Sequence, residues 1–427
     1  MNQIKAITLR LLEFCTLLLV LSMPSACNET ATSADNTAAE KPASDPALDA
    51  FLTDYRTFFL ETMAATRTPG AAIVIVRGDS IVWMEGFGIR QTGSSDSVDI
   101  NTVFRVGSLS KGFAGVLTGI LVQEGWIGWN EHVRDCYPEF TLSDEAQAQR
   151  VQLRHLLSHT TGLPYHAFTH LIERGYDTRK IVSEYFPHAR LSAREGEYYS
   201  YQNAAFSVIE EVMEAATQQP YQELLREKIF TPAGMKNASC DYLSMASCQN
   251  KCLPHFQTGF GFRADSISSL YYNSAAAGGV NASISDMGEW LKLLLGHRDR
   301  IVADSTLDRV FEPVIGTGGE RSVLRHWVRR NDAYYALGWR ILQHYTDTII
   351  YHGGYVNGFR GEIAFNRRDD VGICVLMNAS TELGTLAVTS FFDRFFTFFQ
   401  LRSSGYAPSK MQKLTKNQPV FANGRES

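Results

Sequence analysis

The sequence contains no long run of basic side chains, no internal repeat and no His-Glu-x-x-His pattern. Its 427 residues carry 40 Lys and Arg against 45 Asp and Glu, and a net charge of −5 argues against nucleic acid as a partner. The missing His-Glu-x-x-His pattern argues against a zinc metalloprotease. Apolar residues make up 44% and charged residues 20%, which is typical of a globular protein with a substantial core.

A single short apolar run, Phe14 to Ser22, lies near the N-terminus and is too short to cross a membrane. Lys5 and Arg10 precede it, so residues 1–27 are predicted to be an export signal. Small residues before Cys27 resemble a bacterial lipoprotein processing site, at which Cys27 would be lipidated, and plain cleavage is the alternative. We expect an exported bacterial protein, periplasmic or anchored by an N-terminal lipid.

Cysteines are few, and three of the seven, Cys240, Cys248 and Cys252, cluster just before His255. Three thiols and an imidazole could hold zinc. In an exported protein a disulfide within this loop is the favoured interpretation, although the sequence does not determine which two would pair.

The segments that favour β-structure lie at both ends of the chain. The first two runs, joined by a Gly78-Asp79 turn, and the four later runs are 71–77, 80–87, 336–343, 346–351, 361–366 and 372–378. Helical patterns dominate between them, and an apolar helix at about 383–401 follows. We therefore expect an α/β fold of the α+β type. A central antiparallel sheet from both chain ends has flanking helices, with a mainly helical lobe inserted at about 112–330.

Polar composition marks the limits of this domain. Residues 28–46 are rich in Ala, Thr, Ser and acidic residues and have no apolar period, so a disordered tether is expected there. Residues 403–427 form a second polar segment, expected to be a loose tail. The folded domain is accordingly predicted at 47–402.

Ser108 and Lys111 place a hydroxyl and an amine three residues apart at the start of an apolar helical pattern. Residues three apart share a helix face, so Lys111 can reach the Ser108 oxygen. A buried, neutral amine could take the proton of a serine nucleophile at a helix N-terminus. The alternative is a helix start with a capping serine and a solvated lysine.

Two further motifs follow in order. Tyr201-Gln202-Asn203 begins 93 residues after Ser108, and His352-Gly353-Gly354 begins 151 residues after Tyr201. Together the three motifs resemble those of the serine β-lactamase and penicillin-binding-protein superfamily. The closer match is its class C-like branch, which includes D-alanyl-D-alanine carboxypeptidases, D-aminopeptidases and esterases. The resemblance covers about residues 71–399, with supporting stretches at 104–107, 155–164, 231–235, 276–280 and 337–339.

The resemblance implies a β-lactamase/transpeptidase-like fold and a cofactor-independent serine hydrolase. Ser108 would attack a carbonyl and form an acyl-enzyme, while Lys111 and Tyr201 share the proton transfers. Which of those two is the base stays open. Asn203 would hydrogen-bond Lys111 and the substrate amide.

The third motif would form the substrate-binding edge. Backbone N–H groups of Ser108 and Tyr355 would hold the oxyanion, and Gly353 and Gly354 would leave room for substrate beside the strand. Two other Tyr-x-Asn sequences start at Tyr271 and Tyr355, but the order of motifs favours Tyr201.

The third motif departs from the Lys-Thr-Gly of β-lactamases, because the chain contains no Lys-x-Gly. His352 would be a weaker, pH-dependent cation, and Arg360 is a further candidate for positive charge. A D-amino-acid peptidase or carboxypeptidase, or an esterase, is therefore favoured over a true class C-like β-lactamase. A penicillin-binding receptor without turnover and an interaction protein are alternatives from other classes.

His155 and His159 are four residues apart and could face one zinc ion. A structural role beneath the active-site loop is favoured instead. No metal is expected, and the expected partner is a small-molecule or peptide substrate. The sequence does not give the oligomeric state.

Overall fold

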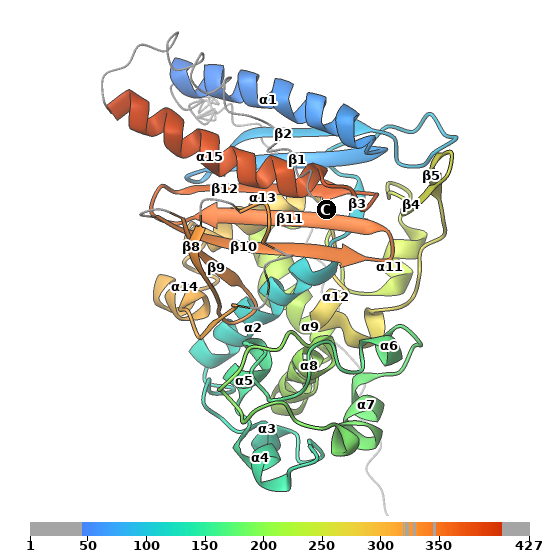
Figure 1. The fold of residues 1–427 in the computed structure, drawn as a ribbon, viewed down its shortest axis with the longest axis vertical. Coiled ribbons are helices and arrows are strands. Elements are labelled where there is room, and N and C mark those ends of the chain that lie inside the picture. The colour runs from blue at the N-terminus through green and yellow to red at the C-terminus, as the bar shows by residue number, and fades with distance from the viewer. Residues whose placement is uncertain (1–44, 319, 321–323, 328–329, 345–346, 404–427) are drawn as a thin grey trace, which may run out of the picture. The chain divides into compact units, whose positions relative to one another are not determined.

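The two ends of the chain build one antiparallel sheet, which confirms the expected fold class. The computed structural model describes residues 45–403 except 319, 321–323, 328–329 and 345–346 (Figure 1). The strands of the large sheet, in spatial order, are β2 (Ser80–Gly88), β1 (Gly70–Arg77), β12 (Val371–Met377), β11 (Phe359–Asn366), β10 (Asp347–Val356), β9 (Arg340–His344), β8 (Arg330–Tyr335) and β7 (Ile315–Gly316). Two N-terminal strands thus join six later ones.

The strands β1 and β12 are mainly apolar because the sheet is covered on both faces. Side chains alternate along a strand, so neighbouring residues enter different cores. In β1, Ile73 and Ile75 belong to the core with the two terminal helices, whereas Val74 and Val76 belong to the core with the middle helices. This two-sided burial explains why the β1 and β12 runs lack a polar alternation.

One face of the sheet is covered by α1 (Pro46–Thr66) and α15 (Leu383–Ser403), which lie side by side at the top of Figure 1. The rings of Phe51 and Phe391 meet edge to face at 5.9 Å, and the Tyr55 hydroxyl donates to the Ala387 carbonyl at 2.8 Å. The apolar pattern predicted α15 well. It did not predict α1, whose sequence carries polar residues on its outer face.

The middle of the chain is mainly helical, and most of its helices lie below the sheet in Figure 1. Its longer helices are α2 (Ser110–Gln123), α8 (Asn203–Thr217), α13 (Ile284–Leu294) and α14 (Asp304–Phe311). Its shorter helical segments are α3 (Val133–Cys136), α4 (Glu145–Arg150), α5 (Leu153–Leu157), α6 (Thr169–Ile172), α7 (Thr178–Glu184), η2 (Phe186–His188), α9 (Tyr221–Leu225), η3 (Arg226–Phe230), α10 (Thr231–Ala233), α11 (Tyr242–Ser247), η4 (Tyr272–Ser274) and α12 (Ala275–Gly278).

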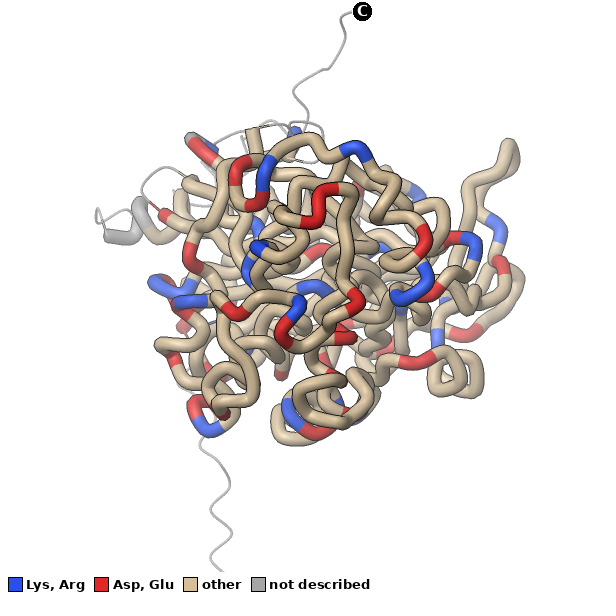
Figure 2. The backbone as a smooth tube through the Cα atoms, turned by 90° about the horizontal axis from the view of Figure 1, so that it is seen from below, with Lys and Arg blue, Asp and Glu red and all other residues tan. Residues whose placement is uncertain are grey.

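Two small sheets complete the described fold. They are β3 (Val103–Arg105) with β6 (Asn281–Ser283), and β4 (His255–Thr258) with β5 (Gly261–Ala264). Basic and acidic residues are interspersed over the helices and loops, as Figure 2 shows from below.

Two strand boundaries differ from the prediction in a way that shapes the site. The run at 336–343 becomes a strand only at Arg340, because residues up to Trp339 form a tight turn in which the Ala336 N–H donates to the Trp339 carbonyl. The run expected to end at Tyr351 continues to Val356 and carries the third motif. It stays paired with β11, where Gly353 lies opposite Glu362.

The predicted export signal, the Cys27 lipidation site and nearly all of the tether and tail lie outside the described residues. Among the helices that the structure describes, none combines the length and apolarity that a membrane span requires.

Candidate active site

Ser108 lies in a 3-10 turn, η1 (Gly107–Leu109), that leads directly into α2. Gly107 has a φ of +57°, and a Cβ there would lie 2.8 Å from the backbone nitrogen of Tyr355. Glycine is therefore required both by the conformation and by the close approach of the neighbouring strand. Ser108 itself stays partly exposed while Gly107 and Leu109 are buried.

Lys111, in the first turn of α2, directs its amine at Ser108, as the spacing predicts. Its Nζ lies 3.2 Å from the Ser108 Oγ, and it donates to Asn203 Oδ1 at 2.8 Å and to the Ala277 carbonyl at 2.9 Å. The side chain is fully buried. Burial, and secondarily the charge of Arg340, hold the pKa of Lys111 well below its usual value, which favours the neutral amine.

Tyr201 approaches Ser108 from the loop before α8. Its hydroxyl donates to the Ser108 Oγ at 3.0 Å. Burial raises the pKa of Tyr201, while the charge of Arg340 and the bond to Ser108 oppose the rise, so the phenol is protonated. Asn203 begins α8 and holds the Lys111 amine. The Lys111 amine and the Tyr201 hydroxyl thus converge on the Ser108 oxygen, and Asn203 holds the amine in place.

The two other Tyr-x-Asn sequences have different positions. Tyr271 donates its hydroxyl to Glu173 at 3.1 Å, and Tyr355 has a half-exposed side chain at the mouth of the pocket. Neither hydroxyl has a described bond to Ser108. The order of motifs therefore selected the tyrosine that contacts the serine.

The third motif lies on the half of β10 that β9 leaves open. Pairing between β9 and β10 ends at Tyr351, so residues 352–356 pair only with β11. A Cβ on Gly354 would lie 3.0 Å from the Ser108 nitrogen and 2.3 Å from the Val106 carbonyl oxygen. Only glycine allows the strand to approach η1 this closely, and this brings the backbone of Tyr355 beside Gly107.

His352 differs from its expected role as the cation that faces substrate. The side chain is fully buried and is absent from the pocket lining. Its Nδ1 lies 2.9 Å from the Gly353 carbonyl, and its Nε2 lies 3.0 Å from the Tyr335 hydroxyl and 3.3 Å from Nη1 of Arg340. Burial and then the charge of Arg340 hold the pKa of His352 well below its usual range. The imidazole is therefore neutral and is buried away from the pocket.

Arg340 and Glu320, which no sequence motif identified, lie together in the pocket wall. Arg340 forms two hydrogen bonds with Glu320, from Nε at 2.8 Å and from Nη2 at 2.7 Å, and both side chains are about 95% buried. The Arg340 Cζ lies 5.4 Å from the ring centre of Tyr201. Arg340 directly follows the supporting stretch Leu337-Gly338-Trp339, which is the one sequence signal that could have identified it.

Arg360, the other candidate cation, does line the pocket. Its guanidinium donates to Oε1 of the buried Glu362 at 3.0 Å and 2.7 Å and to the Thr385 hydroxyl at 2.8 Å. The charge of Arg360 is therefore largely balanced by Glu362.

These residues surround a pocket of about 430 Å³ in which Ser108 is accessible. Residues from η1, the loop before α8, α6, β9, β10 and β11 line it. The exposed rings of Tyr165 and Tyr355 lie at its mouth. The pocket thus opens between the sheet and the helical part.

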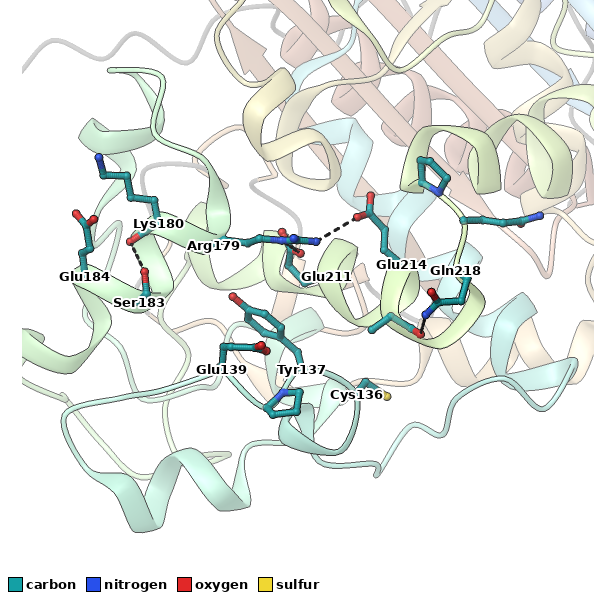
Figure 3. Close-up of a pocket in the computed structure, with 14 residues that line it drawn as sticks. Cys136, Tyr137, Glu139, Arg179, Lys180, Ser183, Glu184, Glu211, Glu214 and Gln218 are labelled. Carbon is teal, nitrogen blue, oxygen red and sulfur yellow. Dashed lines mark hydrogen bonds and ion pairs between the residues drawn. The ribbon is translucent and has the colours of Figure 1, made fainter. Parts of the chain in front are cut away.

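A larger cavity, of about 870 Å³, lies elsewhere, near α7 and α8, and contains none of the predicted site residues. Figure 3 shows its lining, in which Arg179 extends toward Glu211 and Glu214. Arg179 pairs there with Glu211 and Glu214, and the lining lacks a serine beside a buried amine of the kind found at Ser108.

The expected disulfide among Cys240, Cys248 and Cys252 does not form: all three thiols are free, and Cys240 and Cys252 are buried. The described residues contain no group of three His, Cys, Asp or Glu that could hold a metal ion. His155 and His159 instead bind backbone amides, with Nδ1 accepting from Gln152 and from Gln202 respectively, each at 3.1 Å.

Comparisons with known proteins identify the family and the fold. The Beta-lactamase family model matches residues 56–393. Protein flp of Staphylococcus aureus (strain MW2) is 24% identical over 324 residues, covering 74% of this chain and 60% of the relative. Unguisins hydrolase ungD' of Aspergillus campestris is 25% identical over 347 residues, covering 77% of this chain and 61% of the relative. The chain thus spans about 60% of the length of these relatives.

Among solved structures, the octameric penicillin-binding protein homologue from Pyrococcus abyssi superposes with a TM-score of 0.70. The match covers 84% of this chain and 79% of that one at 20% sequence identity. This likeness establishes the shared fold.

Proposed function

Because this chain belongs to the β-lactamase family, we propose that it is a serine hydrolase that cleaves an amide or ester bond through an acyl-enzyme on Ser108. One observation carries the proposal. The Lys111 amine, at 3.2 Å, and the Tyr201 hydroxyl, at 3.0 Å, converge on the Ser108 Oγ inside a pocket. A nucleophile with a base and an acid within hydrogen-bond reach is the arrangement that acyl transfer requires.

Lys111 is the general base in this proposal. A neutral amine has two N–H donors and one lone pair, whereas the ammonium has three donors and no lone pair. The two shortest contacts of Nζ are with oxygens that accept, Asn203 Oδ1 and the Ala277 carbonyl. If these take both N–H groups, the lone pair faces the Ser108 hydroxyl. The lowered pKa of Lys111 supports the same assignment.

In acylation, Lys111 accepts the proton of the nucleophile and Tyr201 donates one to the leaving group. The Ser108 Oγ attacks the carbonyl carbon as its proton passes to Lys111, and backbone N–H groups of Ser108 and Tyr355 stabilise the oxyanion. The bond to the leaving amine or alcohol breaks as Tyr201, protonated at rest, donates a proton. The Tyr201 phenolate recovers that proton from Lys111. Water, deprotonated by the same groups, then hydrolyses the acyl-enzyme.

The charge of the pocket favours neutral or amine-bearing substrates over carboxylates. Its described lining contains two arginines and three glutamates. Each arginine is bound to a buried glutamate. The third glutamate, Glu173, lies at the mouth of the pocket, and the Tyr271 hydroxyl is the one described partner of its carboxylate. This supports a D-amino-acid peptidase or an esterase over a β-lactamase, whose substrates carry a carboxylate.

Export is a separate part of the proposal and depends on residues 1–27. Labelling with radioactive palmitate in a bacterial host tests lipidation. Label that is present in the wild type and lost in Cys27→Ser supports a lipoprotein, and an unlabelled wild type contradicts it.

A matched substrate panel tests the reaction and its preference. D-alanine p-nitroanilide carries a free amine, its N-succinyl derivative carries a carboxylate, p-nitrophenyl butyrate is neutral, and nitrocefin is a carboxylate-bearing β-lactam. We expect turnover of the amine or neutral compounds, slower reaction of the carboxylates, and none with Ser108→Ala. A stoichiometric burst without turnover would instead indicate a receptor.

A further inference from the structure

A chain of buried hydrogen bonds connects Gln202 of the second motif with His352 of the third. His159 Nδ1 accepts the Gln202 backbone N–H, so the proton of its ring is on Nε2, which lies 3.2 Å from the Tyr335 hydroxyl. That hydroxyl lies 3.0 Å from Nε2 of His352. The four side chains of this region, His159, Tyr335, His352 and Arg340, are all at least 96% buried.

The contacts of His352 fix its tautomer. Its Nδ1 faces a carbonyl oxygen, which can only accept, so Nδ1 carries the proton. Its Nε2 then presents a lone pair to the Tyr335 hydroxyl and to Nη1 of Arg340. A protonated His352 would turn an N–H toward the guanidinium and place two buried cations 3.3 Å apart.

The Arg340–Glu320 pair has its positive end toward Tyr201 and His352. The guanidinium lies over the ring of Tyr201 and beside His352, and Glu320 holds its opposite edge with two bonds. Arg340 lowers the pKa of both Lys111 and Tyr201, and its effect on Tyr201 is larger than the opposing effect of Glu320. A positive end therefore faces the groups that move protons.

We propose that Arg340 is the fixed cation of this active site and that His352 is its neutral hydrogen-bond acceptor, so that both are positioning residues behind Ser108, Lys111 and Tyr201. The inference rests on the proposed function. Arg340 favours the neutral amine of Lys111. The hydrogen bonds from His159 through Tyr335 to His352 fix the loop of Tyr201 relative to the open edge of β10. Protonation of His352 plays no part in binding substrate.

A charge-neutral double variant tests the electrostatic part. The ionisable groups that face Lys111 from neighbouring elements are Tyr201, His159, His166, Arg340 and His352. Arg340→Met with Glu320→Gln removes both charges together. We expect the acidic limb of kcat/KM for p-nitrophenyl butyrate to move to higher pH by roughly one unit. Arg340→Lys, which keeps the charge, should restore the limb toward its wild-type position.

Removal of one hydroxyl tests whether the hydrogen-bonded chain positions the site. This test remains available if the double variant does not fold. Tyr335→Phe removes the link between the imidazoles, and we expect kcat to fall roughly tenfold with little change in KM. The matched control is Tyr199→Phe, because the rings of Tyr199 and Tyr335 lie 5.4 Å apart and the buried Tyr199 hydroxyl has no hydrogen-bond partner in the described structure. The control should keep the wild-type kcat.

These outcomes separate the inference from the proposed function. A wild type that hydrolyses no substrate, or Ser108→Ala with full activity, contradicts the proposed function. An active wild type whose acidic limb stays in place in the double variant, or a Tyr335→Phe variant that matches Tyr199→Phe, overturns the inference alone.

Discussion

Nη1 of Arg340 lies 3.3 Å from Nε2 of His352, so the histidine of the third motif has a buried cation beside it. The motif therefore does not supply a charge of its own. The positive charge comes from a neighbouring strand, β9, and is held there by Glu320. This relationship links the departure from Lys-Thr-Gly to the proposed preference for substrates without a carboxylate.

Lys111 should set the acidic limb of the reaction. Because its pKa in the folded protein is lowered, kcat/KM should rise with pH through that value and reach its plateau well below the ordinary lysine pKa. Lys111→Arg, which stays charged, should lower kcat by roughly 10²- to 10⁴-fold. Rates measured from pH 5 to 10 check this. A limb that titrates near pH 10 contradicts the assignment of Lys111 as base.

Glu210 should make the protein less stable as the pH rises. Burial raises the pKa of Glu210 to about 8, although its carboxyl accepts the Ala276 N–H at 2.7 Å. The folded state then holds this proton more tightly than the unfolded state, so the free energy of unfolding falls between about pH 4.5 and pH 8. Glu210→Gln should match the wild type near pH 4.5 and be more stable at pH 9.

Urea unfolding at the two pH values checks the Glu210 prediction. Glu61→Gln, on the exposed side of α1, is the control and should leave the difference between the two pH values unchanged. Parallel pH profiles for Glu210→Gln and the wild type would show that Glu210 is charged in the folded state.

A lysine at the third motif should harm this protein. In His352→Lys the ammonium would replace a neutral acceptor beside Arg340, and an uncompensated buried charge costs about 3–5 kcal/mol. We expect a lower melting temperature and no gain with nitrocefin relative to p-nitrophenyl butyrate. His352→Gln, which is neutral, should be the more stable of the two. A stable His352→Lys variant with improved nitrocefin hydrolysis would restore the view that this position binds an anion.

Glu173 should contribute to the preference for amines. Glu173→Gln removes the carboxylate at the pocket mouth, and an exposed ion pair is worth up to about 1 kcal/mol. We expect KM for D-alanine p-nitroanilide to rise roughly two- to fivefold. The same variant should bind p-nitrophenyl butyrate as the wild type does. Equal changes for both substrates would mean that Glu173 does not recognise the amine.

The sequence predicted much of the fold because its strongest patterns are local. The apolar runs at β1, β2, β11 and β12 and the helix α15 lie close to their expected positions. The pattern could not reveal that α1 packs on α15, since that depends on contacts between residues more than 300 positions apart. It also could not show that the thiols of Cys240, Cys248 and Cys252 stay apart.

Prediction of the site depended on motif order. Ser108, Lys111, Tyr201 and Asn203 were found because short spacings and a fixed order identify them, and the structure brings them together. Glu320 lies in a loop and Arg340 begins β9, 20 residues later, and neither belongs to one of the three motifs, so their pairing becomes visible only in three dimensions. For the same reason the sequence assigned His352 a charge that its buried surroundings do not allow.

The most direct test of the account is the mass of the protein during turnover. Rapid acid quenching of the wild type with p-nitrophenyl butyrate, followed by intact-mass and peptide analysis, should find one butyryl group on the peptide that contains Ser108. Lys111→Arg should reduce the rate at which it forms, and Ser108→Ala should carry none. Steady hydrolysis by a protein that never carries an acyl group on Ser108 would contradict the central claim.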